Sequence, residues 1–352
     1  MSPASDREQK RLTIAIPSYN AEGYLDHCMS TFIASGVIDR LDILIVNDGS
    51  TDSTGDLAAS YEEKYPDCVT VISKQNGGHG SAINTAIAHA TGMYFKVVDV
   101  DDWVEGDGLR ALVDFLETTD VDLVLNPFFV YDQATGKTEI AKREIFKQLP
   151  YRVPVDFADL PVKFPLQMHE ITYRTSMLQD DQVLLDEHTY YVDLEYVMFN
   201  VPKVKTVTLC ENPVYVYRIG SQSQSVSHAN LMKNVRQYRR VMVSCLSYWN
   251  RISPSLGEAY QHYMLRHMAR SMDFSYYILL YFPPTKKLLT ALKQWHRVST
   301  DMMPTSVKLP YSSFVKVLVA CHFHPLHLFV FANRIRQAIN DYYMRNLAKL
   351  RI

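Results

Sequence analysis

The sequence predicts an α/β protein with an open, mostly parallel sheet flanked by helices, followed by a helical C-terminal region. Short apolar runs recur along the first 125 residues, and most are followed by a segment with helical spacing. Strands that alternate with helices in this way build a parallel sheet covered on both faces. After residue 227 the chain turns to helices rich in Tyr, Met, Leu and Arg, so we expect domains at 1–227 and 228–352.

Each predicted strand is a short apolar run closed by polar or turn residues. In chain order these strands are 12–16, 41–46, 69–73, 94–98 and 121–125. The helices expected between them have apolar residues three and four positions apart, and they are 22–33, 51–65, 80–90 and 109–117. Further along, the sequence predicts antiparallel strands around 138–145, a helix at 190–200 and strands at 204–209 and 214–217.

The composition is that of an ordinary globular protein large enough for two domains, with 352 residues, 47% hydrophobic and 21% charged. Residues 1–10 hold no apolar signal-peptide core, so we expect a cytoplasmic protein. The five cysteines are scattered and form no C-x-x-C pair, which speaks against a disulfide framework and a zinc site.

The C-terminal third is basic. Residues 255–352 carry 13 Lys and Arg against 4 Asp and Glu, a balance of +9, while residues 1–254 balance to −11. Two apolar stretches, 276–282 and 314–332, lie in this basic part, and Pro325 argues against a membrane-spanning helix. We expect peripheral attachment to an anionic membrane, on the inner face of the cell membrane. A buried helical subdomain or a homo-oligomer interface is the alternative, and no nucleic-acid partner is expected.

Three polar segments follow predicted strands: 17–20, 47–50 and 99–102. Ligands of open α/β sheets bind outside the carboxyl ends of the strands, so these segments are expected to converge. The last holds Asp99, Asp101 and Asp102 without an opposite charge among them. Such a cluster calls for a divalent cation with oxygen ligands, which can also bind substrate phosphates. Alone it would be a solvated acidic turn; its place beside two other polar strand ends favours the metal site.

Other polar positions admit two interpretations each. Asp48 is either part of an Asx turn or a carboxylate that accepts the imide N–H of a uracil. The loop 74–80 is glycine-rich and can bring backbone amides to a phosphate, but it lacks the Walker and G-x-G-x-x-G patterns. Asp193 is at least a helix N-terminal carboxylate. Arg218 with the hydroxyl-rich segment 221–228 is a diphosphate clamp or a linker.

Taken together, these segments resemble the family 2 glycosyltransferases with a GT-A fold. The order and spacing of the motifs match from residue 11 to about 105, weaken towards 227 and match nothing beyond. The matching motifs are IAIPSYN at 14–20, IVNDGSTD at 45–52, NGG at 76–78 with Ala82 and Asn84, and DVDDW at 99–103.

The resemblance implies an inverting transfer from a nucleotide-diphosphate sugar, with a UDP-sugar expected, to a hydroxyl of a glycan or lipid-linked acceptor. It implies Mn²⁺ or Mg²⁺ at Asp101 and a general base at Asp193. The family often has a Glu before this Asp, where this chain has Val192. The nucleotide-binding residues it implies are Pro17, Tyr19, Asn20, Asp48, Asn76, Gly77 and Asp99. Contacts to diphosphate, sugar or acceptor are expected from Asp102, Trp103, His169, Arg218 and Ser225.

Two other functions fit part of the pattern. A sugar-phosphate nucleotidyltransferase would carry a glycine-rich, Arg- or Lys-bearing loop after its first strand, where this chain has residues 17–20. The presence of Asp48, Asp99, Asp101 and Asp193 together argues against a non-catalytic nucleotide-sugar-binding protein with a degenerate site. The resemblance therefore favours a glycosyltransferase over both.

Overall fold

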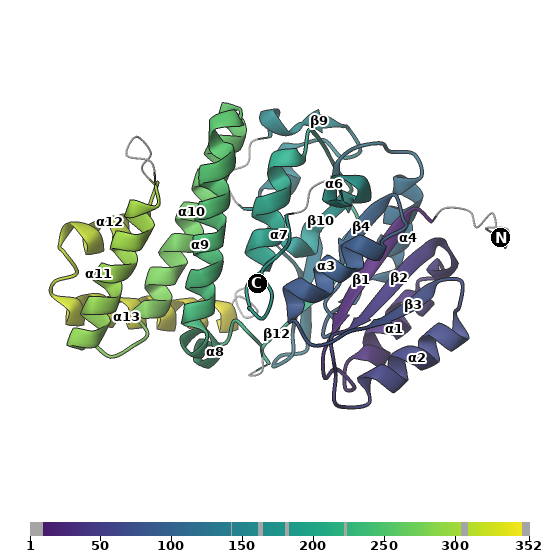
Figure 1. Cartoon of the computed structure of the whole chain (residues 1–352), viewed down its shortest axis with the longest axis horizontal. Coiled ribbons are helices and arrows are strands. Elements are labelled where there is room, and N and C mark those ends of the chain that lie inside the picture. The colour runs from purple at the N-terminus through teal and green to yellow at the C-terminus, as the bar shows by residue number, and fades with distance from the viewer. Residues whose placement is uncertain are drawn as a thin grey trace. The chain divides into compact units, whose positions relative to one another are not determined.

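The computed structural model describes residues 10–141, 143–160, 165–179, 183–221, 224–303 and 309–346, with side chains to residue 338 (Figure 1). The chain forms two compact units, Met1–Gln222 and Ser223–Ile352. This boundary lies five residues before the one expected from the sequence.

The first unit is built on an eight-stranded mixed sheet with the strand order β3-β2-β1-β4-β10-β6-β11-β9. Its strands are β1 (Leu12–Ser18), β2 (Leu41–Asn47), β3 (Val69–Ser73), β4 (Tyr94–Val97), β6 (Leu123–Leu125), β9 (Val155–Asp156), β10 (Ile171–Arg174) and β11 (Thr206–Leu209). The four strands from β3 to β4 are parallel, while β10 runs antiparallel between β4 and β6. The predicted α/β class and the first five predicted strands are confirmed, but β10 was not predicted.

A second, four-stranded sheet has the order β5-β12-β7-β8. Its strands are β5 (Trp103–Val104), β7 (Phe128–Asp132), β8 (Lys137–Ile140) and β12 (Tyr215–Ile219). Trp103 in β5 pairs with Val216 in β12, so this sheet joins the segment after the carboxylate cluster to a strand more than a hundred residues further along.

The helices of the first unit cover both faces of the large sheet. They are α1 (Leu25–Ala34), α2 (Thr54–Lys64), α3 (His79–His89), α4 (Gly106–Leu116), α5 (Ile145–Gln148), α6 (Thr175–Gln179) and α7 (Asp193–Asn200), with short 3₁₀ turns at Ile38–Arg40, Phe157–Asp159, Met168–Glu170 and Val201–Lys203. Apolar residues of α1 and α4 share one core with Leu12, Ile14 and Ile16 of β1. Alternate strand residues face opposite sides, and α3 packs on β1 and β2 outside that core cluster.

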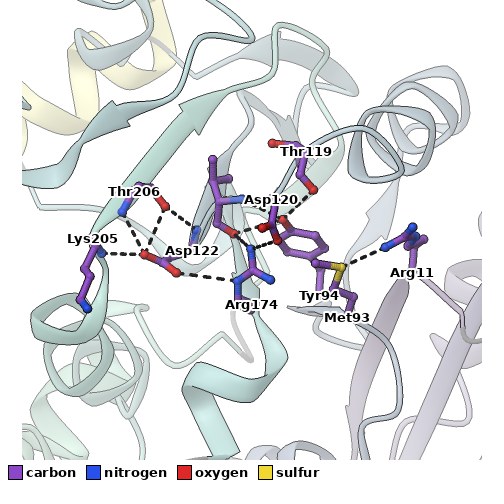
Figure 2. A network of polar contacts seen from close by, with 10 residues as sticks. Arg11, Met93, Tyr94, Thr119, Asp120, Asp122, Arg174, Lys205 and Thr206 are labelled. Carbon is purple, nitrogen blue, oxygen red and sulfur yellow. Dashed lines mark hydrogen bonds and ion pairs between the residues drawn. The ribbon is translucent and has the colours of Figure 1, made fainter.

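Charged side chains fix the unpredicted strand β10 at its far end (Figure 2). Arg174 donates to Asp120 Oδ1 at 2.6 Å and to the carbonyl of Val121 at 3.0 Å, and its guanidinium lies 5.6 Å from the ring centroid of Tyr94. Asp122 accepts from the backbone of Thr206 at 2.9 Å. These contacts tie β4, β6, β10 and β11 together at the edge opposite the predicted site.

The second unit is helical, as the sequence predicts. Its helices are α8 (His228–Lys233), α9 (Val235–Ile252), α10 (Glu258–Leu279), α11 (Lys286–Asp301), α12 (Ser313–Ala320) and α13 (Leu326–Asn346), with a 3₁₀ turn at Ser253–Ser255. Its core includes Trp249, Trp295 and Tyr276, and the Trp295 indole donates to Ser275 at 2.7 Å. Within the described residues, no helix combines the length and apolarity needed to cross a membrane.

Candidate active site

The ends of β1, β2 and β4 meet at one edge of the large sheet because the three strands are parallel neighbours. The amide of Asp48 donates to the carbonyl of Ser18 at 2.9 Å. The Asn20 side chain, on a residue with φ of 47°, accepts from the amide of Thr51 at 2.8 Å. The two loops that carry the nucleoside-binding predictions therefore form one connected surface, from which Tyr19 projects with 52% of its area exposed.

Asp48 is buried and organises the glycine loop. One carboxylate oxygen accepts from Gly77 N at 2.9 Å and from Lys74 Nζ at 3.0 Å, and the other accepts from Gly78 N at 2.7 Å. Asn76 donates to the Asp48 carbonyl at 2.9 Å. The amides of Gly77 and Gly78 thus bind a carboxylate of the protein, whereas the sequence suggested that they face a phosphate. The expected contact of Asp48 with a uracil stays a prediction.

The glycines are needed because another loop lies directly on them. A Cβ on Gly80 would clash with the carbonyl of Asp186, and Gly78 has a φ of +84° with His188 close by. His188 N donates to the Gly77 carbonyl at 2.5 Å. The loop leading into α7 therefore packs directly on the glycine-rich loop 74–80, which Asp48 anchors. Asp48 and Asp193 thus belong to one packed assembly.

His79 connects the glycine loop to the carboxylate cluster. It opens α3, and its Nε2 lies 2.7 Å from Asp99 Oδ1. Burial lowers the pKa of His79, but the carboxylates of Asp99, Asp193 and Asp101 outweigh burial and raise it overall. Burial likewise raises the pKa of Asp99, and the neighbouring His79 reverses this shift and lowers it. Asp99 is thus held ionised by a histidine for which the sequence analysis gave no role.

Asp101 has the surroundings expected of a cation ligand. Burial and the nearby Asp99 carboxylate raise its pKa, against the opposing Arg218 and His79. Within the described residues, no group of three or more His, Cys, Asp or Glu side chains could hold a metal ion by itself. A single carboxylate such as Asp101 would fit Mg²⁺, which proteins often bind through only one or two carboxylates.

Asp102 points the other way and anchors β12. It is buried, and its carboxylate accepts from the Tyr215 hydroxyl at 2.5 Å and from the Arg218 amide at 2.7 Å. The same hydroxyl oxygen accepts from Asp99 N at 3.2 Å. Burial, then Asp101 and Asp99, raise the pKa of Asp102 well above its usual range. These contacts support the turn, and the expected contact of Asp102 with diphosphate, sugar or acceptor stays a prediction.

Asp193 is the first residue of α7, and part of its surface is exposed although neighbouring atoms crowd its carboxyl group. Its pKa is raised, first by desolvation and then by Asp99, while His79 opposes the shift. Burial also raises the pKa of Tyr217, with contributions from Asp102 and Asp193. The Asp193 carboxylate therefore lies close enough to His79 and Asp99 to interact electrostatically with both.

An aromatic cluster holds Arg218 close to Asp101. The guanidinium lies 5.1 Å from the ring centroid of Tyr24 and 5.2 Å from that of Trp103, at the distances of cation–π contacts. Trp103 also meets the ring of His27 edge-on at 4.7 Å. Arg218 is thus held beside the carboxylates, and its expected contact with a diphosphate stays a prediction. Ser225 belongs to the second unit, and its role stays a prediction.

The His169 ring lies among aromatic rings, and its backbone carbonyl accepts a hydrogen bond from a buried lysine. Its ring centroid is 4.4 Å from that of Tyr217 and 4.8 Å from that of Tyr215. Burial lowers its pKa to about 4. Lys96, which is fully buried in β4, donates to the carbonyls of His169 at 2.9 Å and Ile171 at 3.1 Å. The lysine therefore fixes the backbone from which His169 approaches the site.

We expect Lys96 to make the stability of the protein depend on pH. Burial lowers its pKa from the ordinary 10.5 to about 7, with Glu170 opposing. The unfolded chain binds this proton more tightly than the folded protein does. The charged, buried lysine therefore destabilises the fold fully below pH 7, and this destabilisation is gone above pH 10.5. Between pH 7 and pH 10, the free energy of unfolding should rise by about 3 kcal/mol more in the wild type than in Lys96→Met.

Urea unfolding at the two pH values measures this difference. Lys147→Met, at an exposed lysine, is the matched control and should follow the wild type. A gap between wild type and Lys96→Met that stays constant with pH would refute the lowered pKa.

Three residues of the candidate site could not be predicted from the sequence: His79, Lys96 and Tyr215. A histidine between glycines at a helix start was a usable signal for the first. Lys96 offered a weaker one, as a charge inside an apolar run. Nothing in the sequence reveals that Tyr215 meets Asp102, because the two are 113 residues apart.

Comparison with known proteins identifies the family of the first unit. Residues 13–181 match the family model "Glycosyl transferase family 2". The poly(ribitol-phosphate) beta-glucosyltransferase of Bacillus spizizenii is 25% identical over 222 residues, which are 62% of this chain and 34% of that protein. The chain spans 11% to 62% of the lengths of the curated relatives considered.

Two solved structures share the fold. Staphylococcus aureus TarS 1–349 in complex with UDP-GlcNAc superposes with a TM-score of 0.62 at 18% identity, covering 92% of this chain and 89% of that one. The mannosyltransferase PcManGT of Pyrobaculum calidifontis, in complex with GDP-Man and Mn²⁺, gives 0.52 at 15% identity, covering 93% and 86%. Residues 13–181 of this chain therefore belong to glycosyl transferase family 2, in a unit that has the GT-A fold.

Proposed function

We propose that this chain is an inverting glycosyltransferase that moves a sugar from a nucleotide-diphosphate sugar, with UDP as the expected nucleotide, to a hydroxyl of a glycan or lipid-linked acceptor. One observation carries the proposal: a single packed assembly joins the Asp48-anchored loop, the Asp99 and Asp101 carboxylates and Asp193 through His79. The complex of TarS with UDP-GlcNAc supports the donor class. The name of the Bacillus spizizenii relative supports a polymeric acceptor.

Asp193 is the group proposed to accept the proton of the acceptor hydroxyl. The hydroxyl oxygen forms its bond to the anomeric carbon from the face opposite the nucleotide, while the bond from that carbon to the phosphate oxygen breaks. A base with a raised pKa holds a proton more readily than an ordinary aspartate, which suits this role. The nucleoside diphosphate leaves with the bonding electrons, and the positive charge of Arg218 lies close enough to Asp101 to stabilise it.

Asp101 is proposed to hold the cation, with the diphosphate as its other partner. A bound Mn²⁺ or Mg²⁺ would neutralise charge on the diphosphate. The Mn²⁺ in the PcManGT complex supports this assignment. One carboxylate oxygen of Asp99 contacts His79. Its second oxygen is proposed to contact a ribose or sugar hydroxyl.

The proposal predicts which donors are consumed and which product appears. In the presence of Mn²⁺, a screen of UDP-sugars and GDP-mannose should show release of nucleoside diphosphate, with at least one UDP-sugar preferred. Phosphorus NMR identifies the product, and chelation of the metal should stop the release. Pyrophosphate as the product would instead identify a nucleotidyltransferase, and binding of a donor without turnover would identify a non-catalytic binding protein.

We place the protein in the cytoplasm, peripheral on the inner face of the cell membrane, because its C-terminal part is basic and an acceptor of the lipid-linked class would reside there. Self-association through the helical unit is the competing role for that unit.

A further inference from the structure

The outer face of α13 is apolar, although nothing in the second unit covers it among the described residues. The helix buries one side through Leu326, Val330 and Asn333, and the Asn333 side chain donates to the Tyr277 carbonyl at 3.2 Å. An isolated apolar side chain on a surface would be ordinary. On the opposite side of this helix, however, three large apolar residues follow one another.

Leu328, Phe331 and Ile335 form this outer stripe and are 55%, 61% and 45% exposed. Their spacing of three and four residues puts them on one line along the helix. The line lies opposite the positions of Leu326 and Val330, so packing within the unit does not explain it. A helix that is apolar on its outer side has a second partner to bury it against.

The charges around the stripe select the partner. Between residues 302 and 340 the sequence has no Asp or Glu, but it has four Lys or Arg and three His. Arg334 and His327 are exposed on the same helix, and Lys316 is exposed on α12. The carboxylate of Asp273 on α10 interacts with Lys316 and Arg336. A partner with negative charges at its surface and an apolar layer beneath them matches both the exposed cations and the apolar stripe.

We propose that the outer face of α13, defined by Leu328, Phe331 and Ile335 with Arg334 beside them, docks on an anionic lipid surface. The helix lies in the plane of the interface, with its three apolar side chains inserted below the headgroups and its cations among the lipid phosphates. It does not cross the membrane, in agreement with the absence of a long apolar helix from the described residues. A second copy of the chain would bury the apolar stripe but would place cations against cations.

Co-sedimentation of the full-length protein with vesicles tests this surface without any substrate, so failure here leaves the proposed glycosyl transfer untouched. The protein should bind vesicles that contain phosphatidylglycerol, bind pure phosphatidylcholine vesicles at least ~10-fold more weakly, and be released by salt. Changing Leu328, Phe331 and Ile335 together to Ser should weaken binding at least ~10-fold. Arg334→Gln should weaken it about fivefold.

Ile140→Ser removes a comparably exposed apolar side chain from β8 and is the matched control, expected to bind as the wild type does. Urea unfolding of each variant verifies that the fold is retained. Equal binding to neutral and anionic vesicles would overturn the proposal. So would a wild-type dimer that the triple Ser variant dissociates, without vesicle binding by either protein.

Discussion

Replacement of Asp193 by Asn is expected to lower sugar transfer by about 10²- to 10⁴-fold while nucleotide binding stays at the wild-type level. The amide keeps the shape of the carboxyl but cannot take the proton of the acceptor hydroxyl. Asp48 and not Asp193 accepts the hydrogen bonds that hold the glycine-rich loop 74–80, so removal of the Asp193 charge should leave that loop in place. Initial rates and calorimetric titration with UDP measure the two effects separately.

Asp107→Asn is the matched control for Asp193→Asn, because Asp107 also lies in the first turn of a helix and is exposed. Loss of a carboxylate from a helix N-terminus costs at most about 1 kcal/mol at an exposed position and should leave turnover unchanged. The pH profile gives a second readout. Since the pKa of Asp193 is raised, the base is protonated, and activity lost, at a higher pH than for an ordinary aspartate. Wild-type turnover by Asp193→Asn would remove this residue from the role of base.

The adjacent pair Asp101 and Asp102 should separate into one functional and one structural effect. Asp101→Asn is expected to abolish the response of turnover to Mn²⁺ and to lower the rate by at least ~10²-fold, with the free energy of unfolding unchanged or slightly higher. The unchanged stability follows because neighbouring carboxylates and burial disfavour the Asp101 charge.

Asp102→Asn should instead destabilise the fold by about 1–3 kcal/mol, because an amide cannot accept from both Tyr215 and the Arg218 amide with the same geometry. Turnover titrated against Mn²⁺, together with urea unfolding, distinguishes the two variants. If Asp101→Asn kept a wild-type metal response, or if Asp102→Asn alone lost it, the assignment of the cation to Asp101 would be wrong.

The parallel half of the sheet could be predicted because each of its strands is a local pattern. The runs 12–16, 41–46 and 69–73 are apolar and closed by turn residues, and each appears as a strand with its end within two residues of the prediction. The strand β10 escaped because its position depends on partners distant in the sequence. Arg174 is held by Asp120 and by the Val121 carbonyl, and no local pattern reveals such contacts.

The chemistry at the site divides in the same way. Asp48, Asp99 and Asp101 could be singled out because each directly follows a predicted strand, and parallel strands bring such positions to one edge. Their tasks could not be distinguished from the sequence. Only the structure shows that the Asp48 carboxylate accepts hydrogen bonds from the amides of Gly77 and Gly78. Among the described residues, no other side chain donates a hydrogen bond to the Asp101 carboxylate.

The stereochemistry of donor hydrolysis tests inverting glycosyl transfer most directly, and it needs no knowledge of the natural acceptor. With Mn²⁺ and an α-linked UDP-sugar from the donor screen, water replaces the acceptor hydroxyl, and proton NMR follows the sugar before its anomers interconvert. The proposed mechanism predicts that the β anomer of the free sugar appears first, together with UDP, and that Asp193→Asn suppresses both. First appearance of the α anomer, or release of pyrophosphate in place of UDP, would contradict it.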